Sequence, residues 1–99
     1  KKITVVAGPT VSWLAPPANE CAAKTEQLAV IGDAVKKVEQ VAFTLDGKRI
    51  GVDKSGPLGI FSFTWKTGKT AKGSHILVAT LTDASGATAA SARKIKVCK

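Results

Sequence analysis

Side chains that could carry chemistry are scarce in this sequence of 99 residues. It contains two cysteines, Cys21 and Cys98, and a single histidine, His75. The wide separation of the cysteines excludes a CxxC redox motif, and two cysteines with one histidine make a poor set of zinc ligands. Two alternatives remain for the cysteines: free structural thiols in a reducing compartment, or one disulfide in an exported protein, which we favour.

The acids and nucleophiles show no spacing that predicts a reaction. A Ser–His–Asp triad would need Ser74 or Ser85 to lie beside His75, and nothing in the sequence brings them together. The seven acidic residues are scattered and fall largely in turns, which does not support the paired carboxylates of a glycoside hydrolase. Four of them could meet at loop ends to bind Ca²⁺, but no D-x-D-x-D-G run is present: Asp33, Asp46, Asp53 and Asp83. We therefore expect no catalytic residues, no metal site and no cofactor, and a protein that is not an enzyme.

The segment WKTGKTAKG is the candidate for contact with an anion or a glycan. It carries Lys66, Lys69 and Lys72 on a connection rich in Gly and Thr, without the spacing of a phosphate-binding P-loop. An acidic glycan or phosphate polymer could dock there against Trp65, and an exposed Trp13 could add a carbohydrate or interdomain contact. The alternative, which we favour for the loop, is that Trp65 fills the core while the lysines are solvated. Trp13 is then either a cap on the core or an exposed contact.

Net charge and composition limit the partners. Fifteen cations against seven acids give +8 at pH 7, which favours anionic partners in general. Aromatic residues make up only 5% of the chain and fall mostly on expected core faces, so a platform for stacking nucleic acid bases is poorly supplied and nucleic acid is not expected. No apolar run approaches the ~20 residues that cross a bilayer, so no membrane insertion is expected.

Alternation of apolar and polar residues predicts an all-β domain of about seven short strands. The clearest unit is a hairpin over residues 41–52, in which Asp46 and Gly47 form a two-residue turn. That turn pairs Leu45 with Lys48, and continued pairing would set Phe43 opposite Ile50 and Val41 opposite Val52. Further expected core positions alternate along two later strands: Phe61, Phe63, Trp65, Leu77, Ala79 and Leu81.

These segments resemble the bacterial Ig-like domains of exported and cell-surface proteins. The resemblance rests on a V-x-F-x-x-D-G-x-x-I-G hairpin at residues 41–51, a G-S-H-x-L-x-A strand at residues 73–79, and a D-x-x-G turn at residues 83–86. Pro57 ahead of the aromatic strand that ends near Trp65 adds to it. The match covers roughly residues 9–97 and implies an antiparallel Ig-like β-sandwich. It divides the chain into an Ig-like domain at 9–99 and a leading segment at 1–8, which is a linker, a leading strand or the end of a preceding domain.

The resemblance also implies a role for the cysteines and for the protein. In Ig-like folds an early segment often runs parallel to the last strand, which would bring Cys21 and Cys98 to the same end and allow a disulfide there. The expected function is a non-catalytic structural, spacer or interaction module of a secreted or cell-surface bacterial protein. Its partners would be neighbouring domains of the same precursor, or a cell-surface polysaccharide or protein ligand. The alternative function is an accessory binding module for polysaccharide or another anionic surface polymer.

Overall fold

The computed structural model describes residues 9–34, 37–56 and 59–98. No helix among these residues is long and apolar enough to cross a membrane. They form seven strands and one 3₁₀ turn: β1 (Thr10–Ala15), β2 (Thr25–Asp33), β3 (Val38–Leu45), β4 (Lys48–Asp53), β5 (Ile60–Lys66), η2 (Thr67–Lys69), β6 (Gly73–Asp83) and β7 (Thr88–Val97). The predicted leading segment, residues 1–8, lies outside the described residues, as does Lys99, so the domain boundary stays a prediction.

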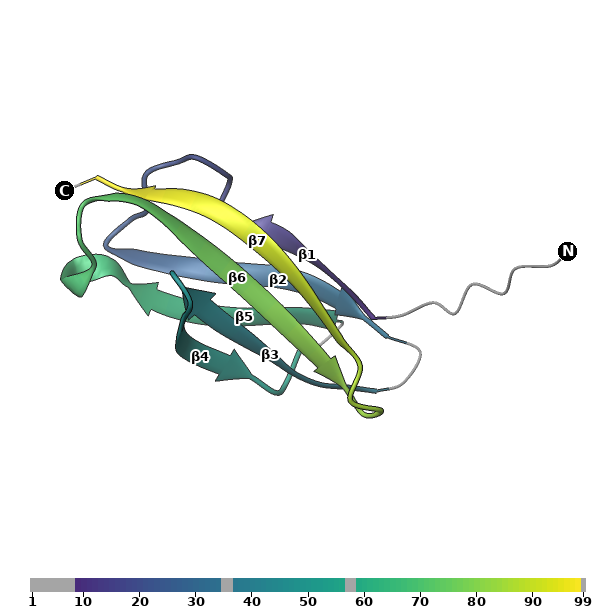
Figure 1. The fold of residues 1–99 in the computed structure, drawn as a ribbon. Helices are drawn as coiled ribbons and strands as arrows, with labels where there is room; N and C mark the ends of the chain where they lie inside the picture. Colours follow the sequence, from purple (N-terminus) through teal and green to yellow (C-terminus); the bar gives the residue numbers. More distant parts are fainter. Residues whose placement is uncertain (1–8, 35–36, 57–58, 99) are drawn as a thin grey trace, which may run out of the picture.

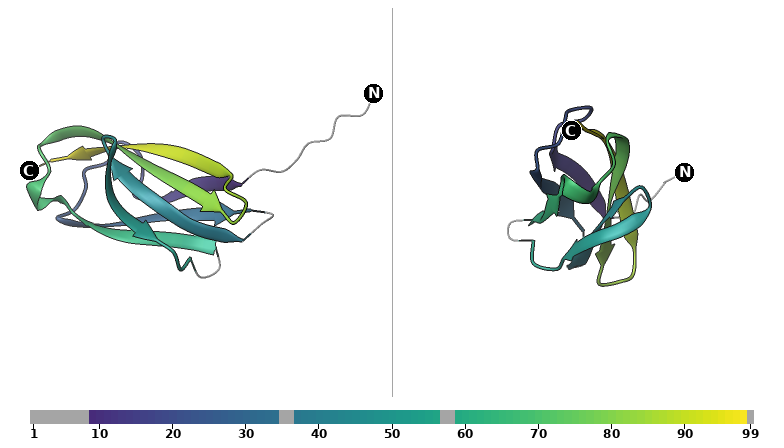
Figure 2. Two further views of the ribbon diagram at one scale, coloured as in Figure 1. Left: turned by 60° about the horizontal axis from the view of Figure 1, so that its bottom comes forward. Right: turned by 90° about the vertical axis from the view of Figure 1, so that its left-hand side faces the viewer.

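The strands build two antiparallel sheets that lie face to face (Figure 1; Figure 2, right). One sheet has the order β1-β2-β5, and the other has the order β4-β3-β6-β7. This is the antiparallel sandwich of about seven strands predicted from the alternation of apolar and polar residues.

The strands run along the long axis of the sandwich, which therefore has two ends (Figure 1). At one end, the N-terminal pole, Thr10 at the start of β1 pairs with Asp33 at the end of β2. At the other end, the C-terminal pole, Val97 at the end of β7 pairs with Gly73 at the start of β6. The first strand thus begins at one pole and the last strand ends at the other.

Side chains that point between the two sheets form one apolar core. Alternate residues of a strand point to opposite faces, so one side of each sheet is buried and the other meets solvent. The predicted inward positions on β5 and β6 are confirmed, with Phe63 only partly buried. The fully buried large side chains come from both sheets: Phe43, Leu28, Leu77, Leu81, Ile95, Val30 and Val41.

The β3–β4 hairpin has the predicted turn but a different register beyond it. Asp46 and Gly47 both have positive φ, 50° and 87°, and Leu45 pairs with Lys48 as expected. Past Thr44, however, a β-bulge leaves one extra residue on β4, so Phe43 pairs with Gly51 instead of Ile50. The expected pairing of Val41 with Val52 is likewise wrong, because Val41 pairs with Asp53. Val52 therefore moves off the core face.

Candidate functional site

The lysine-rich connection between β5 and β6 is anchored at the C-terminal pole by Thr67. The buried Thr67 hydroxyl donates to the carbonyl oxygen of Ala23 at 3.0 Å, and its backbone N–H donates to that of Lys24, also at 3.0 Å. The 3₁₀ turn η2 closes with the Thr70 N–H donating to the Thr67 carbonyl at 2.9 Å. These bonds tie the connection to the start of β2. They leave the three predicted contact residues exposed: Lys66, Lys69 and Lys72.

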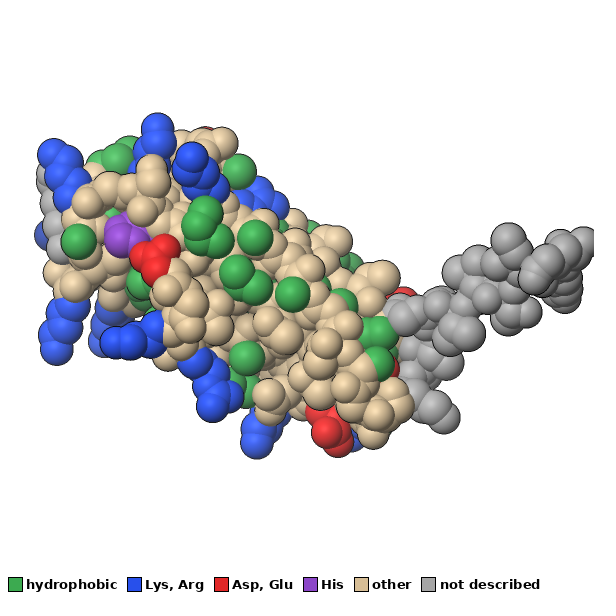
Figure 3. Space-filling model, viewed as in Figure 1, with side chains coloured by type: hydrophobic (Ala, Val, Ile, Leu, Met, Phe, Trp, Pro, Cys, Tyr) green, Lys and Arg blue, Asp and Glu red, His purple; other side chains and the backbone are tan. Residues whose placement is uncertain are grey.

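Strand register brings further cations to the same pole. Six basic residues from other segments join the three lysines there, and of these six Arg93 is partly buried while the others are exposed: Lys24, Lys48, Arg49, Arg93, Lys94 and Lys96. Three acids accompany them: Glu20, Glu26 and Asp46. At the N-terminal pole the balance is reversed, with Lys37 and Lys54 against Asp33, Glu39, Asp53 and Asp83. The charge of the described residues is therefore concentrated at the C-terminal pole, where blue side chains gather in Figure 3.

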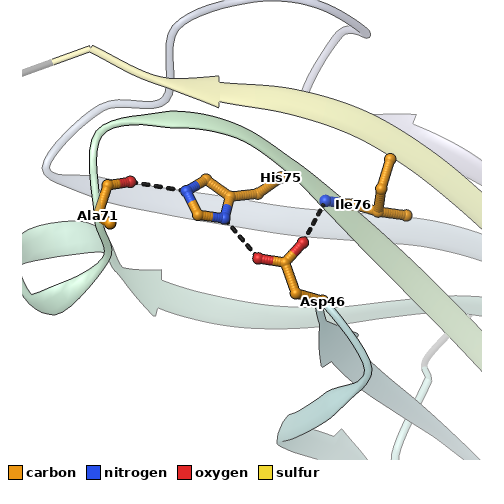
Figure 4. Close-up of polar contacts among 4 residues, drawn as sticks. All are labelled: Asp46, Ala71, His75 and Ile76. Atoms are coloured by element: carbon orange, nitrogen blue, oxygen red, sulfur yellow. Dashed lines mark hydrogen bonds and ion pairs between the residues drawn. The ribbon is translucent and has the colours of Figure 1, made fainter.

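His75 links three segments at the C-terminal pole (Figure 4). Its Nδ1 meets a carboxylate oxygen of Asp46, in the β3–β4 turn, at 2.5 Å, and its Nε2 meets the carbonyl oxygen of Ala71 at 2.6 Å. The other carboxylate oxygen of Asp46 accepts the Ile76 N–H at 2.9 Å. Both ring nitrogens therefore face acceptors, an arrangement that only the doubly protonated imidazolium satisfies completely.

This geometry shifts the pKa of both partners. Hydrogen bonds to Asp46 and then to the Ala71 carbonyl raise the pKa of His75 above its ordinary value. Hydrogen bonds from His75 and from the Ile76 N–H lower the pKa of Asp46. His75 therefore has a structural role, in which its ring joins the β3–β4 turn to the start of β6 by hydrogen bonds. The pairing with Asp46 was not predicted, because it depends on β3 lying beside β6, where Leu45 pairs with Leu77.

Stability is expected to fall as the pH rises through the raised pKa of His75. A group whose folded pKa exceeds its unfolded value stabilises the fold fully below the unfolded value, about 6.5, and loses that contribution above the folded value. Asp46 acts in the opposite sense, since its lowered pKa gives a contribution that is lost as the pH falls below about 4. The pair should therefore stabilise the domain most between those limits.

The His75→Gln variant tests this dependence. The effect should not exceed about 1 kcal/mol, because the Asp46 side chain is 49% exposed and solvent screens the pair. For a domain of this size that limit corresponds to a fall in Tm of about 4–8 °C. Thermal melts between about pH 5 and about pH 9, a range that includes the ordinary histidine pKa of about 6.5, should show this fall in stability for the wild type and not for the variant. An equal fall in Tm for the variant would refute the assignment of this pH dependence to His75.

The two cysteines form a disulfide at the C-terminal pole, as the resemblance implied. Their Cα atoms lie 5.5 Å apart, and Cys21 forms a parallel bridge with Lys96 of β7. On either side of Cys21, the Lys96 N–H donates to the Glu20 carbonyl at 3.0 Å and the Ala22 N–H donates to the Lys96 carbonyl at 2.8 Å. The segment before β2 therefore runs along β7, which places the two sulfur atoms together.

Trp13 lies in the core and offers no exposed aromatic face. Its side chain is 8% exposed, its ring centroid lies 6.0 Å from that of Phe43, and its Nε1–H donates to the Ser91 carbonyl at 2.8 Å. The expectation of a glycan contact at Trp13 is thus corrected in favour of its alternative, a core residue. Trp65 is also buried, at 4% exposure. Cations, without aromatic stacking surfaces, remain as the candidate contacts at this pole.

The described residues do not bring the elements of a reaction together. Ser85 donates to Asp83 at the end of β6, whereas His75 lies near its start, about 30 Å away at the usual rise per strand residue. Ser74 is next to His75, so its side chain points to the opposite face of the sheet. Within residues 9–34, 37–56 and 59–98, no three potential metal ligands cluster.

Comparison with known proteins gives a family and several structural likenesses. Residues 9–79 match the family model described as bacterial Ig domain. No curated protein sequence matches the chain. Among solved structures, the fibronectin(III)-like modules of Clostridium thermocellum CbhA are similar, with a TM-score of 0.74 and 24% identity over 95% of this chain and 48% of that one. The endo-β-1,4-mannanase from Thermotoga petrophila is similar with a TM-score of 0.79 and 18% identity, over 96% of this chain and 21% of that one.

These likenesses concern the fold. An engineered protein shares it too, with a TM-score of 0.70 and 17% identity. The chain spans about half the length, or less, of each of these structures. In each case, a domain of this shape is therefore one part of a longer polypeptide.

Proposed function

The chain belongs to the bacterial Ig domain family, and we propose that it is a non-catalytic spacer module that holds neighbouring domains of one protein apart. The observation that carries this proposal is the position of the two described ends. The chain enters the sandwich at the N-terminal pole with β1 and leaves it at the C-terminal pole after β7 (Figure 1). A domain threaded in this way adds its own length between whatever precedes and follows it.

We place this module in an exported or cell-surface bacterial protein. The Cys21–Cys98 disulfide supports that location, because disulfides persist in oxidising compartments and are rare in the reducing cytosol. The family also supports it, because the sequence resembles the bacterial Ig-like domains of exported and cell-surface proteins. The partners are then the neighbouring domains of the same chain.

A second candidate function is the binding of an anionic surface polymer such as an acidic polysaccharide. The segregation of charge favours it, because eight exposed basic side chains at the C-terminal pole, from four different segments, would attract a linear polyanion. Lysine predominates among them, and a lysine ammonium makes point-charge contacts instead of the paired hydrogen bonds of arginine. Such binding would depend strongly on salt and weakly on the identity of the polymer.

Titration with polygalacturonate, a carboxylated polysaccharide, and with neutral hydroxyethyl cellulose separates the two candidates. A pure spacer predicts no saturable binding of either polymer at physiological ionic strength. If polygalacturonate binds, the triple variant Lys66→Gln, Lys69→Gln, Lys72→Gln should weaken that binding by roughly fivefold to a hundredfold, since each lost cation removes an attraction of about 0.3–1 kcal/mol. The matched control Lys37→Gln, Lys54→Gln removes charge from the other pole and should leave it unchanged. Saturable binding with this pattern would contradict a spacer role alone.

A further inference from the structure

The disulfide divides the chain into a short part that lies in the path of a pulling force and a long part that does not. Cys21 and Cys98 are separated by 77 positions, and the loop that they close contains every strand from β2 to β7. Tension that enters at Pro9 passes along β1 and the segment 16–20 to Cys21. It then crosses the sulfur–sulfur bond to Cys98 and leaves the domain. Of the strands that the structure describes, β1 alone lies on this path.

We propose that the disulfide makes this module a load-bearing tether of bounded extension: under tension it can release β1 but cannot unravel β2 to β7. The inference rests on the proposed spacer function, because a spacer between two domains transmits whatever force separates them. A covalent bond between the two ends of the loop carries the load without any help from packing. The six strands inside the loop are therefore shielded from it.

The pairing of β1 with β2 opposes even the limited extension that comes from release of β1. β1 starts at the N-terminal pole and pairs with β2 from Thr10 to Ala15, so a pull at Thr10 directed away from that pole slides β1 along β2. Backbone hydrogen bonds that run across the direction of sliding are loaded together and not one at a time. Release of β1 also requires Trp13 to leave the core and to break its bond to the Ser91 carbonyl. Trp13 is thus the anchor of the only strand on the force path.

A second set of bonds braces the disulfide. The Asn19 N–H donates to the Lys94 carbonyl at 2.8 Å, and Glu20 and Ala22 pair with Lys96. These contacts hold the segment around Cys21 along the last residues of β7, next to Cys98. The load therefore reaches the disulfide at the same pole where the chain leaves the sandwich. The force does not pass through β2 to β7.

The length that the module can gain under tension differs by about an order of magnitude between the oxidised and the reduced protein. Fully extended, residues 9–21 reach at most about 40 Å. The folded β1 alone already covers about 20 Å of that distance, so the oxidised module can gain no more than about 20 Å. With the disulfide open, the 77-position loop adds up to about 260 Å.

Single-molecule force spectroscopy on the full chain, held by a handle at each end in optical tweezers, tests the proposal. The oxidised protein should show no lengthening step greater than about 20 Å. After dithiothreitol is added to the same protein, a further step approaching about 260 Å should appear. The double variant Cys21→Ala, Cys98→Ala should show the long step without reductant. If that variant does not fold, the reduced wild type provides the same comparison.

Two results would overturn the proposal. One is a long step in the oxidised protein, and the other is the absence of added length after reduction. The Trp13→Phe variant examines the anchor: it removes the bond to Ser91 and should lower the force of the short step while leaving the oxidised length limit unchanged. An unchanged force would contradict the role of Trp13. The length limit depends on the disulfide alone. A chain that fails to space its neighbours would therefore refute the proposed spacer function and leave the length limit intact.

Discussion

Removal of the Cys21–Cys98 disulfide is expected to lower the free energy of unfolding by about 4–5 kcal/mol. The crosslink closes a loop of 77 positions, so the unfolded chain with the bond intact has far fewer conformations than the chain without it. The loop-entropy relation converts that length into about 4.5 kcal/mol at 25 °C. A domain of this size has a total stability of about 5–15 kcal/mol, so the loss would remove a large part of it.

Urea denaturation of the oxidised protein, the reduced protein and the Cys21→Ala, Cys98→Ala variant measures this effect. The reduced wild type and the variant should agree with each other, because both lack the crosslink and differ only in two small side chains. The control is the oxidised protein treated with an alkylating agent, whose midpoint should not move, since no free thiol exists among the described cysteines. Equal midpoints for the oxidised and reduced proteins would contradict the prediction.

The Phe43→Ala variant is expected to lose about 3–5 kcal/mol of stability. Phe43 is fully buried on the central strand β3, and its ring centroid lies 6.0 Å from that of Trp13 and 6.2 Å from that of Phe63. Truncation removes the apolar surface of the ring and leaves a cavity between the two sheets. The neighbours cannot close it easily, because Trp13 is held by its bond to Ser91.

The matched control is Ile60→Ala, which truncates a large apolar side chain that is 40% exposed on the outer face of β5. Its cost should be clearly smaller, since less surface leaves water on folding and no enclosed cavity forms. Both variants can be compared with the wild type by urea denaturation with the disulfide intact. A loss at Phe43 no greater than the loss at Ile60 would show that the core does not centre on Phe43.

The β3–β4 hairpin shows what alternation in a sequence can predict and where it stops. The Asp-Gly pair identified the turn, because a two-residue turn of this kind needs positive φ at both positions. Alternation alone does not reveal an extra residue, and the bulge beyond Thr44 therefore changed the register. Gly51 carried the missing signal: a Cβ there would lie 2.3 Å from the Phe63 ring, and glycine inside a strand often marks a bulge or a close approach.

At the C-terminal pole, individual residues could be predicted from the sequence better than the way in which distant segments come together. The disulfide followed from the resemblance, which supplied the parallel course of an early segment and the last strand. Spacing could not predict that Lys24, Lys48 and Lys96 lie at the same pole as the lysine-rich connection, because these residues come from segments far apart in the chain. The sequence around Trp13 likewise could not show whether its side chain is exposed, since its burial depends on Phe43 and Ser91, which are distant in the chain.

Small-angle X-ray scattering of the chain with one compact fluorescent protein fused to each end tests the spacer role most directly. The reference is the same fusion without residues 9–98. Since β6 alone has 11 residues and rises about 3.3 Å per residue, the sandwich should move the two markers apart by about 35 Å. A rigid spacer should give that gain, unchanged between low and high salt. Markers that are no further apart than in the reference, or a separation that drifts with salt as in a flexible linker, would contradict it.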